Sequence, residues 1–390
     1  MSSVMKTYDR INLSFTKGEG PWLYTEEGKK YLDFTSGIAV TSLGHANPEL
    51  INTLINQAKK LWHTSNLYKI EPQEQLADLI CENSFGESVF FCNSGAEAIE
   101  GVVKLVRRYH FNNGFPNKNK MLVFSNAFHG RTIETLAAGD NNDHRIGFAV
   151  NTELFRKVPF GEMGEIEKLI DEETAGILVE PIQGEGGINL PPDDYLLFLR
   201  KLCSDKGILL AFDEVQTGIG RTGKLFAYQW SEVLPDVMGL AKGLGGGFPI
   251  GAVVANKITS EVLSPGTHGS TFGGNFLAAS VAKEVLIKLL QPNFLDNVIE
   301  TGRELMQGIR FLSDKYKNVI TGVRGRGLMI GIESKVKNVD LATALRDEGL
   351  LSVAAAGNIV RFLPPLNIDR THVKIGIEIL EKAIKLINEK

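Results

Sequence analysis

The sequence predicts an α/β fold, with a mostly parallel, buried sheet and helices on both of its faces. Short apolar segments alternate with segments of helical periodicity through residues 48–255. Strands that are separated by helices run parallel and are covered on both faces. Polar, glycine-rich stretches follow several of these segments, which is where open α/β sheets bind ligands. With 390 residues, 43% of them hydrophobic and 23% charged, the chain is long enough for two domains.

The charge and composition disfavour several classes of protein. A net charge of -4 provides no basic surface for nucleic acid or for an anionic membrane. The N-terminal residues lack the apolar core of a signal peptide, and no apolar run is long enough to span a bilayer. Cys81, Cys92 and Cys203 lie far apart without CxxC spacing, so neither a zinc site nor a disulfide framework is expected. These features predict a cytoplasmic protein in a reducing environment.

The first part of the chain is expected to form short strands and then two helices. Extended segments at 22–24 and 31–34 are connected by a turn that contains a glycine. A helix is predicted over 48–62, because Pro48 stands at its start and apolar residues recur on one face. A second helix covers about 71–83.

From residue 89 onward, strands and helices alternate. The strands are short apolar runs, predicted at 89–91, 121–124, 176–179, 207–212, 237–241 and 250–255. A helix over 95–111 has a well-specified start, because Ser94 and Glu97 match a capping box.

Three segments are expected to build two domains. Residues 1–45 join a small domain, 46–275 form the large domain, and 276–390 form a connecting helix and the rest of the small domain. The last segment begins with a long helical pattern that runs to about residue 315. It continues with a strand entry at 323–331 and ends in a helix over 371–389.

Lys242 is the residue with the clearest chemical implication. It ends an apolar strand and runs directly into the glycine-rich stretch 243–247. Burial at the end of a strand disfavours its charge, and no counter-ion is adjacent in sequence. A neutral lysine amine is suited to forming a Schiff base with a carbonyl. The alternative is a lysine whose amine reaches from the strand end to solvent.

Two strand-to-helix connections carry further candidates. The free amides of Gly95 and Ala96, at the positive end of a helix dipole, are suited to a phosphate group, and the alternative is a plain capped helix. After the next strand, Phe128 is able to stack on a flat ring and Arg131 to grip a carboxylate. The alternative there is a core phenylalanine and a surface arginine.

Acidic residues follow two other strands. Asp213 stands where α/β sheets contact ligands and would hold a heteroaromatic nitrogen protonated by charge pairing. A metal site formed with Glu214 is disfavoured, because adjacent strand residues point to opposite faces and no histidine is near in sequence. Glu180 suits a structural loop anchor, whereas Glu185 stands among glycines and is better placed to meet a ligand or an arginine.

The loop at 268–275 is polar and glycine-rich and leads into a helix. The hydroxyls of Ser270 and Thr271 would suit a phosphate or a carboxylate, and the alternative is a capped helix start. With the sites above, the chain provides a phosphate cradle, a stacking ring, a carboxylate for a ring nitrogen and a Schiff-base lysine. These are the parts that a pyridoxal 5′-phosphate enzyme needs.

Long stretches of the chain resemble the class III aminotransferases, which are pyridoxal-phosphate enzymes of fold type I. The matching stretches are 31–40, 63–68, 128–132, 184–187, 213–223 and 361–366. Within the class, the chain is similar to the subgroup that acts on N-acetylornithine. The resemblance spans nearly the whole chain. It implies a large domain with a mostly parallel seven-stranded sheet, and a smaller α+β domain built from the N- and C-terminal segments.

The resemblance also implies roles around a bound pyridoxal phosphate. Lys242 would hold the cofactor and, once released, shuttle a proton between the substrate and the cofactor. Asp213 would pair with the ring nitrogen, and Phe128 would stack on the ring. Val215 and Gln216 would border the ring near its phenolic oxygen.

Further cofactor contacts and a homodimer follow from the same resemblance. Gly95 and Ala96 would hold the phosphate, together with Thr271 of the other subunit. Glu214, in the matching stretch 213–223, is also expected to be a cofactor-binding residue.

The implied reaction converts N-acetyl-L-ornithine and 2-oxoglutarate to N-acetyl-L-glutamate 5-semialdehyde and L-glutamate, a step in arginine synthesis. Arg131 would bind the substrate carboxylate, and Ser270 would contact the substrate. Arg361 would bind the second carboxylate of glutamate. Glu185 would act as its gate, pairing with Arg361 when the terminal amine is bound and moving away for glutamate.

Other activities remain as alternatives. The amine donor could be ornithine, 4-aminobutyrate or N-succinyl-diaminopimelate, and aminomutases and decarboxylases share the scaffold. Two departures from the usual pattern concern substrate preference: Phe276 stands where proline is common, and 137–140 lacks a frequent threonine-glycine pair. A nucleotide-binding protein is disfavoured, because the stretch 243–247 lacks the spacing of the common nucleotide loops.

Overall fold

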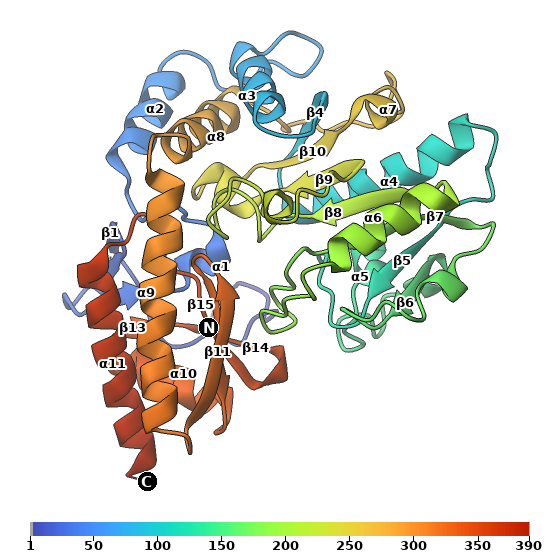
Figure 1. The fold of residues 1–390 in the computed structure, drawn as a ribbon. Helices are drawn as coiled ribbons and strands as arrows, with labels where there is room; N and C mark the ends of the chain where they lie inside the picture. Colours follow the sequence, from blue (N-terminus) through green and yellow to red (C-terminus); the bar gives the residue numbers. More distant parts are fainter. Residues whose placement is uncertain (1–2, 390) are drawn as a thin grey trace.

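The computed structural model describes residues 3–389, and its centre is a seven-stranded sheet with the order β4-β10-β9-β8-β7-β5-β6 (Figure 1). The strands are β4 (Ser88–Cys92), β5 (Lys120–Phe124), β6 (Phe155–Val158), β7 (Thr174–Val179), β8 (Leu209–Asp213), β9 (Val237–Leu240) and β10 (Gly251–Ala255). Strands β6, β5, β7, β8 and β9 pair in parallel, whereas β10 runs antiparallel to both β9 and β4. The predicted mostly parallel, seven-stranded sheet is confirmed.

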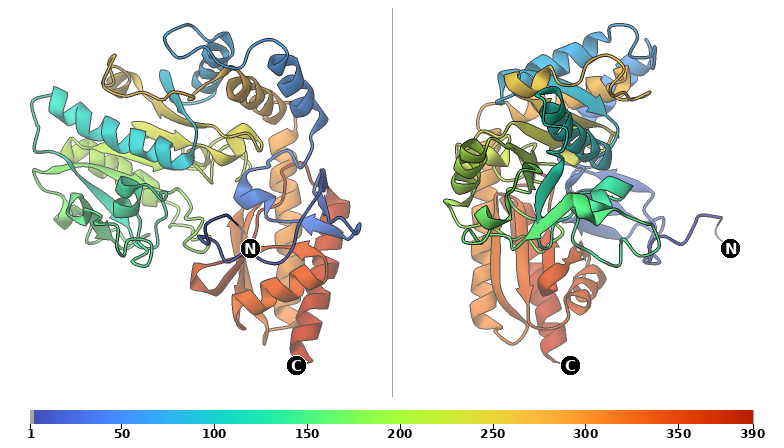
Figure 2. Two further views of the ribbon diagram at one scale, coloured as in Figure 1. Left: turned by 180° about the vertical axis from the view of Figure 1, so that it is seen from behind. Right: turned by 90° about the vertical axis from the view of Figure 1, so that its right-hand side faces the viewer.

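Successive residues of the central strands face two different layers of the core. Leu210 of β8 belongs to the buried cluster that includes side chains of α6 (Tyr195–Lys206). Ala211, the next residue, belongs to the cluster that includes side chains of α4 (Gly95–Asn112). Figure 2 shows these two helices on opposite sides of the sheet. Side chains alternate along a strand, so apolar residues at consecutive positions require cover on both faces.

One strand of the sheet has a weak sequence signal. β6 (Phe155–Val158) lies at the edge of the sheet beside β5, and no strand was predicted there. Its two central residues, Arg156 and Lys157, are charged and only partly buried. Charged residues are common on edge strands because they disfavour pairing with other chains, but they remove the apolar pattern that predicts a strand.

Two predictions for the C-terminal part are corrected by the structure. The long helical pattern is divided into α8 (Phe276–Leu289) and α9 (Phe294–Lys315), because Pro292 and a left-handed Asn293, with φ of 65°, interrupt it. The strand entry at 323–331 is a hairpin of β11 (Ile320–Arg326) and β12 (Met329–Ser334).

Two four-stranded sheets lie beside the large one, in the orders β1-β2-β3-β13 and β11-β12-β15-β14. β3 pairs with β13 in parallel, so the N-terminal strands join the C-terminal part of the chain. The remaining strands are β1 (Lys17–Glu19), β2 (Trp22–Tyr24), β3 (Lys30–Asp33), β13 (Leu350–Leu351), β14 (Val353–Ala355) and β15 (Ile359–Phe362). The remaining helices are α1 (Ser36–Ala39), α2 (Pro48–Ala58), α3 (Glu71–Glu82), α5 (Ile133–Ala138), α7 (Lys257–Ser260), α10 (Asn338–Asp347) and α11 (Arg370–Asn388). Each helix within residues 3–389 is too short or too polar to cross a bilayer.

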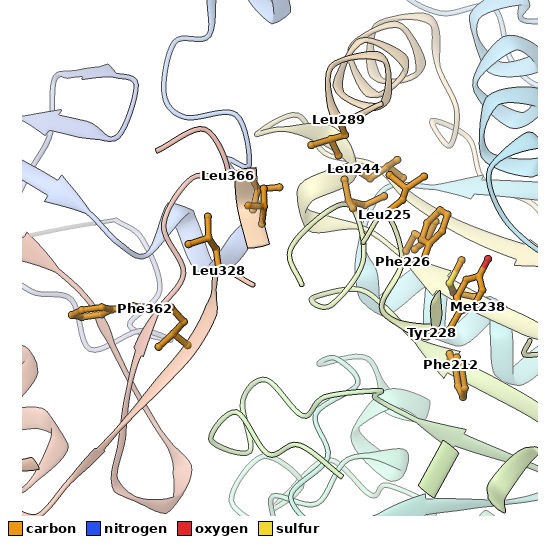
Figure 3. Close-up of a cluster of buried hydrophobic side chains, with 14 of the residues drawn as sticks. Phe212, Leu225, Phe226, Tyr228, Met238, Leu244, Leu289, Leu328, Phe362 and Leu366 are labelled. Carbon is orange, nitrogen blue, oxygen red and sulfur yellow. The ribbon is translucent and has the colours of Figure 1, made fainter. Parts of the chain in front are cut away.

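The large sheet and the C-terminal part share one continuous apolar core. Leu328 and Leu366 belong to the same buried cluster as Leu244 and Leu289 (Figure 3). A side chain at Gly220 would lie 3.0 Å from Leu366 and 3.4 Å from Leu289, so the loop after β8 passes between the two parts. This packing fixes the position of β15 relative to the carboxyl ends of the large sheet.

Candidate active site

A cavity of about 330 Å³ lies at the carboxyl ends of β8 and β9, beside the start of α4. Several of the residues that the sequence singles out line it together: Gly95, Ala96, Phe128, Asp213, Val215, Gln216 and Lys242. They come from four separate stretches of chain. Parallel strands place their following loops at one edge of the sheet, which explains why residues far apart in sequence meet there.

Lys242 follows β9 and begins a short 3-10 turn. Its backbone has a φ of 44°, a left-handed conformation that costs energy for a residue with a side chain. Burial lowers the pKa of its amine; the Glu185 carboxylate opposes that effect and the Arg361 cation adds to it. Among residues 3–389, none accepts a hydrogen bond from the Lys242 Nζ atom. The amine is therefore held in an environment that favours its neutral, reactive form.

Asp213 is the last residue of β8, and its carboxylate is buried and held at both oxygens. Oδ1 accepts a hydrogen bond from the Val215 amide at 3.0 Å, and Oδ2 lies 2.7 Å from His129 Nδ1. Burial alone would lower the pKa of His129, but the hydrogen bond and charge of Asp213 outweigh burial and raise it. His129 thus supports Asp213 as an anion at the cavity. His129 directly follows Phe128, but no local sequence pattern indicates its contact with Asp213.

The start of α4 leaves two amides facing the cavity. Ser94 caps the helix, with its hydroxyl accepting a hydrogen bond from the Glu97 amide at 3.2 Å. The amides of Gly95 and Ala96 make no hydrogen bond to the described residues, as expected for the first turn of a helix. A Cβ atom at Gly95 would lie 2.7 Å from Val215 Cγ1, so glycine is needed for this close approach. The result is a helix end beside Val215 that is suited to an anion.

Glu185 and Arg361 form a bidentate ion pair at the side of the cavity. Arg361 on β15 donates from Nη1 to Oε1 at 2.7 Å and from Nη2 to Oε2 at 2.8 Å. Burial alone would raise the pKa of Glu185, but the charge and hydrogen bonds of Arg361 outweigh it and lower the pKa. Gln216 lines the cavity and bridges the pair, accepting from Arg361 at 3.3 Å and donating to Glu185 at 3.4 Å.

Arg131 lies in a second cavity, of about 540 Å³, that adjoins the first. Phe128 lines both cavities, and Glu185 lines the second. The Arg131 guanidinium carbon is 5.6 Å from the centre of the Phe128 ring. Glu185, the partner of Arg361, thus lines the same cavity as Arg131.

A family model for "Aminotransferase class-III" matches residues 3–384. The chain belongs to the class-III aminotransferases. It is 49% identical to "Acetylornithine aminotransferase 1" of Bradyrhizobium diazoefficiens over 385 aligned residues. The alignment covers 99% of this chain and 95% of the relative. The activity that this name describes is that of the relative.

Solved structures resemble the aminotransferase over nearly its full length. The N-acetylornithine aminotransferase of Stenotrophomonas maltophilia K279a is 35% identical, with a TM-score of 0.87 and 98% of both chains covered. An ornithine aminotransferase of Toxoplasma gondii, described with partial occupancy of PLP at its active site, is 33% identical. Its TM-score is 0.95, with 99% of this chain and 93% of that chain covered. The predicted fold type I of pyridoxal-phosphate enzymes is confirmed.

Besides Arg131, Glu185 and Arg361, three further residues that were predicted for the site of this aminotransferase lie outside the first cavity: Glu214, Ser270 and Thr271. The Glu214 carboxylate accepts hydrogen bonds from the amides of Ala227 and Tyr228 at 2.6 and 2.8 Å. It points away from Asp213 because adjacent strand residues face opposite sides, and burial raises its pKa to about 7. Ser270 is held beside the cavity wall, while Thr271 is exposed.

Glu180 lines the cavity of the aminotransferase and connects two of its loops. Its carboxylate accepts hydrogen bonds from the Phe128 amide and the Gly184 amide, both at 3.0 Å. Burial raises the pKa of Glu180 to about 7. These contacts suit the loop anchor predicted from the sequence, because they tie the loop of the stacking ring to the loop that carries Glu185.

Proposed function

We propose that this aminotransferase transfers the terminal amine of N-acetyl-L-ornithine to 2-oxoglutarate, giving N-acetyl-L-glutamate 5-semialdehyde and L-glutamate in arginine synthesis. The observation that carries the proposal is the Glu185–Arg361 ion pair beside the Lys242 amine. An arginine that is paired in one state and free in another lets one cavity accept both a terminal amine and an amino acid. The names of relatives at 43–49% identity favour N-acetylornithine among such substrates.

Pyridoxal 5′-phosphate is the cofactor that the residues of the cavity fit. The free amides at the start of α4 suit a phosphate, the face of Phe128 suits a flat ring, and the anionic Asp213 suits a protonated ring nitrogen. The space at Gly95, which a Cβ would fill, supports this assignment. When bound, the cofactor supplies an aldehyde that links to amines and a cationic ring that withdraws electrons from the bond that breaks.

The side chains of the cavity would then divide the work as follows. Lys242 Nζ, with its lowered pKa, takes a proton from the carbon that carries the reacting amine and later donates one. Asp213 holds a proton at the ring nitrogen, and His129 Nδ1–H keeps its carboxylate oriented. Val215 and Gln216 close the side of the cavity, which limits the entry of water.

The two arginines would bind the two ends of the substrates. Arg131 is assigned to the carboxylate far from the reacting amine, with Ser270 as a further substrate contact. Arg361 is assigned to the carboxylate beside the amine of glutamate. While N-acetylornithine reacts, Glu185 keeps Arg361 paired, so that no unpaired cation faces the incoming amine.

We also propose a homodimer in which Thr271 of each chain reaches the cofactor of the other. Glu214 does not face the cavity, so we assign it an indirect role, through its position next to Asp213. Support comes from exposed apolar side chains that lie next to this loop. His63 and Phe272 have ring centres 5.4 Å apart, and Trp62 and Phe272 are 63% and 61% exposed. The division into 1–45, 46–275 and 276–390 is retained as a proposal, supported by the pairing of β3 with β13.

A panel of half-reactions tests the proposed function. The absorbance of the bound cofactor is followed as N-acetylornithine, ornithine, 4-aminobutyrate or N-succinyl-diaminopimelate is added to the enzyme. We expect kcat/KM to be at least about tenfold higher for N-acetylornithine than for ornithine and 4-aminobutyrate, a difference of ~1.4 kcal/mol. A higher value for another amine would replace the proposed substrate, and turnover without 2-oxoglutarate would indicate an aminomutase.

Glu185→Ala is expected to change the relative rates of the two half-reactions by at least about tenfold. Loss of the carboxylate leaves Arg361 unpaired, which disfavours the terminal amine of N-acetylornithine and favours the carboxylate of glutamate. Single-turnover rates with each substrate measure the ratio. Glu381→Ala, which removes a glutamate paired with Lys315 far from the cavity, is the control. An unchanged ratio in Glu185→Ala would rule out the gate.

A further inference from the structure

The loop after α5 places a histidine against Arg131 in the second cavity. His144 lines this cavity with Phe128, Arg131 and Glu185. Arg131 Nη2 donates a hydrogen bond to His144 Nε2 at 3.0 Å. Within residues 3–389, this is the hydrogen bond that the Arg131 side chain makes. An exposed arginine has many accessible rotamers, so a single directed contact has a large effect on where its cation lies.

The hydrogen-bond pattern fixes the chemical form of His144. Asn141 Nδ2 also donates to His144 Nε2, at 3.2 Å. The orientation of the Asn141 amide is set by its oxygen, which accepts a hydrogen bond from the Asp143 amide at 2.9 Å. An arginine and an amide nitrogen are donors only, so Nε2 must be an acceptor. His144 is therefore the neutral imidazole with its proton on Nδ1.

The ring of Phe128 supports the same arrangement. The rings of His144 and Phe128 are 6.3 Å apart and nearly perpendicular, at 87°. The Arg131 cation lies over the Phe128 ring at 5.6 Å. The base of the loop is anchored by Asp140, which accepts a hydrogen bond from the Asn126 amide at 2.8 Å and pairs with Lys157 at 2.7 Å. The imidazole thus stands on an anchored loop beside the stacking ring.

The charged groups that face His144 act in both directions. Burial and the Arg131 cation lower the pKa of His144, whereas Asp143 and Glu185 raise it, and the balance lies below the ordinary value. Asp140 also lines the cavity, but its charge is shared with Lys157. Protonation of Nε2 would replace an acceptor by a donor facing two donors. The contact with Arg131 is therefore lost as the pH falls through the pKa of His144.

We propose that His144, oriented by Asn141, is a positioning residue that aims Arg131 at the distal carboxylate of the substrate and releases it when the imidazole is protonated. This inference rests on the proposed function, which assigns Arg131 to that carboxylate. It goes beyond that function because binding of the substrate carboxylate would then depend on a second residue, His144, which lies outside the first cavity. It also gives that binding a pH dependence of its own.

The first test is NMR of the holoenzyme with labelled histidine, and it needs no substrate. The His144 signal is assigned by its loss in His144→Gln. We expect the tautomer with a proton on Nδ1, a midpoint below that of an ordinary histidine, and an upward shift of the midpoint in Arg131→Met. His372, which pairs with Asp369 at the start of α11, is the internal control and should not respond. A proton on Nε2 of His144, or a His144 midpoint that is unchanged in Arg131→Met, would overturn the proposal.

The second test compares N-acetylornithine with N-acetylputrescine, which has the same amine but lacks the carboxylate. His144→Phe is expected to raise KM for N-acetylornithine about tenfold with kcat retained, because an aligned charge-assisted contact is lost, and to leave N-acetylputrescine unchanged. In the wild type, KM for N-acetylornithine should rise as the pH falls through the His144 midpoint. His144→Gln keeps a neutral acceptor at every pH, so it should rescue KM and remove this dependence.

The outcomes separate the inference from the function on which it rests. Equal losses for both amines in His144→Phe, or identical pH profiles of KM in wild type and His144→Gln, would overturn the role of His144. Rejection of N-acetylornithine by the wild type would instead overturn the proposed function. In that case L-glutamate replaces N-acetylornithine as the carboxylate-bearing substrate, and the NMR test still decides whether His144 and Arg131 are coupled.

Discussion

Lys242→Ala is expected to lower kcat by roughly 10⁴-fold or more with every amine donor, because the variant loses both the covalent attachment of the cofactor and the proton-transfer group. The Lys242 amine has a lowered pKa and no hydrogen-bond acceptor among the described residues, which suits a base at neutral pH. Single-turnover kinetics with N-acetylornithine measure the loss. Borohydride treatment followed by peptide mass spectrometry should label Lys242 in the wild type.

Two controls separate chemistry from folding for this variant. Lys257→Ala removes an exposed lysine at the start of α7 and should retain full activity. A small added amine should partly restore the proton transfer in Lys242→Ala, because the space vacated by the side chain opens onto the cavity. Borohydride labelling of another lysine, or substantial activity in Lys242→Ala without added amine, would contradict the assignment.

Asp213→Asn should lower kcat by about 10²- to 10³-fold, a range of ~3–4 kcal/mol in transition-state stabilisation. The amide has nearly the same shape, but it does not carry the negative charge that holds a proton at the ring nitrogen. His129 would lose its anionic partner at 2.7 Å, so the pKa of His129 should fall as well. The half-reaction rate and the absorbance of the bound cofactor report the two effects.

Asp236 provides a matched control for Asp213. It is also a buried aspartate beside β9, but its carboxylate pairs with Arg200 and accepts the Leu210 amide away from the cavity. Asp236→Asn is expected to lower the free energy of unfolding by about 1–3 kcal/mol and to leave the cofactor absorbance unchanged. If Asp236→Asn changed the absorbance as much as Asp213→Asn, the pairing of Asp213 with the ring would be wrong.

The core strands and the residues after them are readable from the sequence because their signals are local. Apolar runs too short for helices identify β7, β8 and β9, and the residue types at their ends indicate chemistry. β6 was missed because an edge strand with two central charges has no apolar run. The division between α8 and α9 was missed because apolar residues continue across Pro292, and periodicity alone does not place a break.

The contacts between side chains depend on packing that no local pattern specifies. The sequence marks His129 only as the neighbour of Phe128, but the crossing of loops sets its Nδ1 beside Asp213. The carboxylates of Asp213 and Glu214 are adjacent in sequence, yet one faces the cavity and the other faces the amides of Ala227 and Tyr228. The side of the sheet on which the neighbouring loops form the cavity decides which of the two carboxylates faces it.

The sequence by itself determined the fold type and the family, because long motifs at the ends of buried strands are local and specific. It also indicated Lys242 as the reactive amine. The resemblance also implied that Glu185 pairs with Arg361. Only the tertiary structure decided that His129 is hydrogen-bonded to Asp213, and His144 to Arg131 in an adjoining cavity. These pairings depend on the distances and burial of side chains, which arise when separate loops pack against one core.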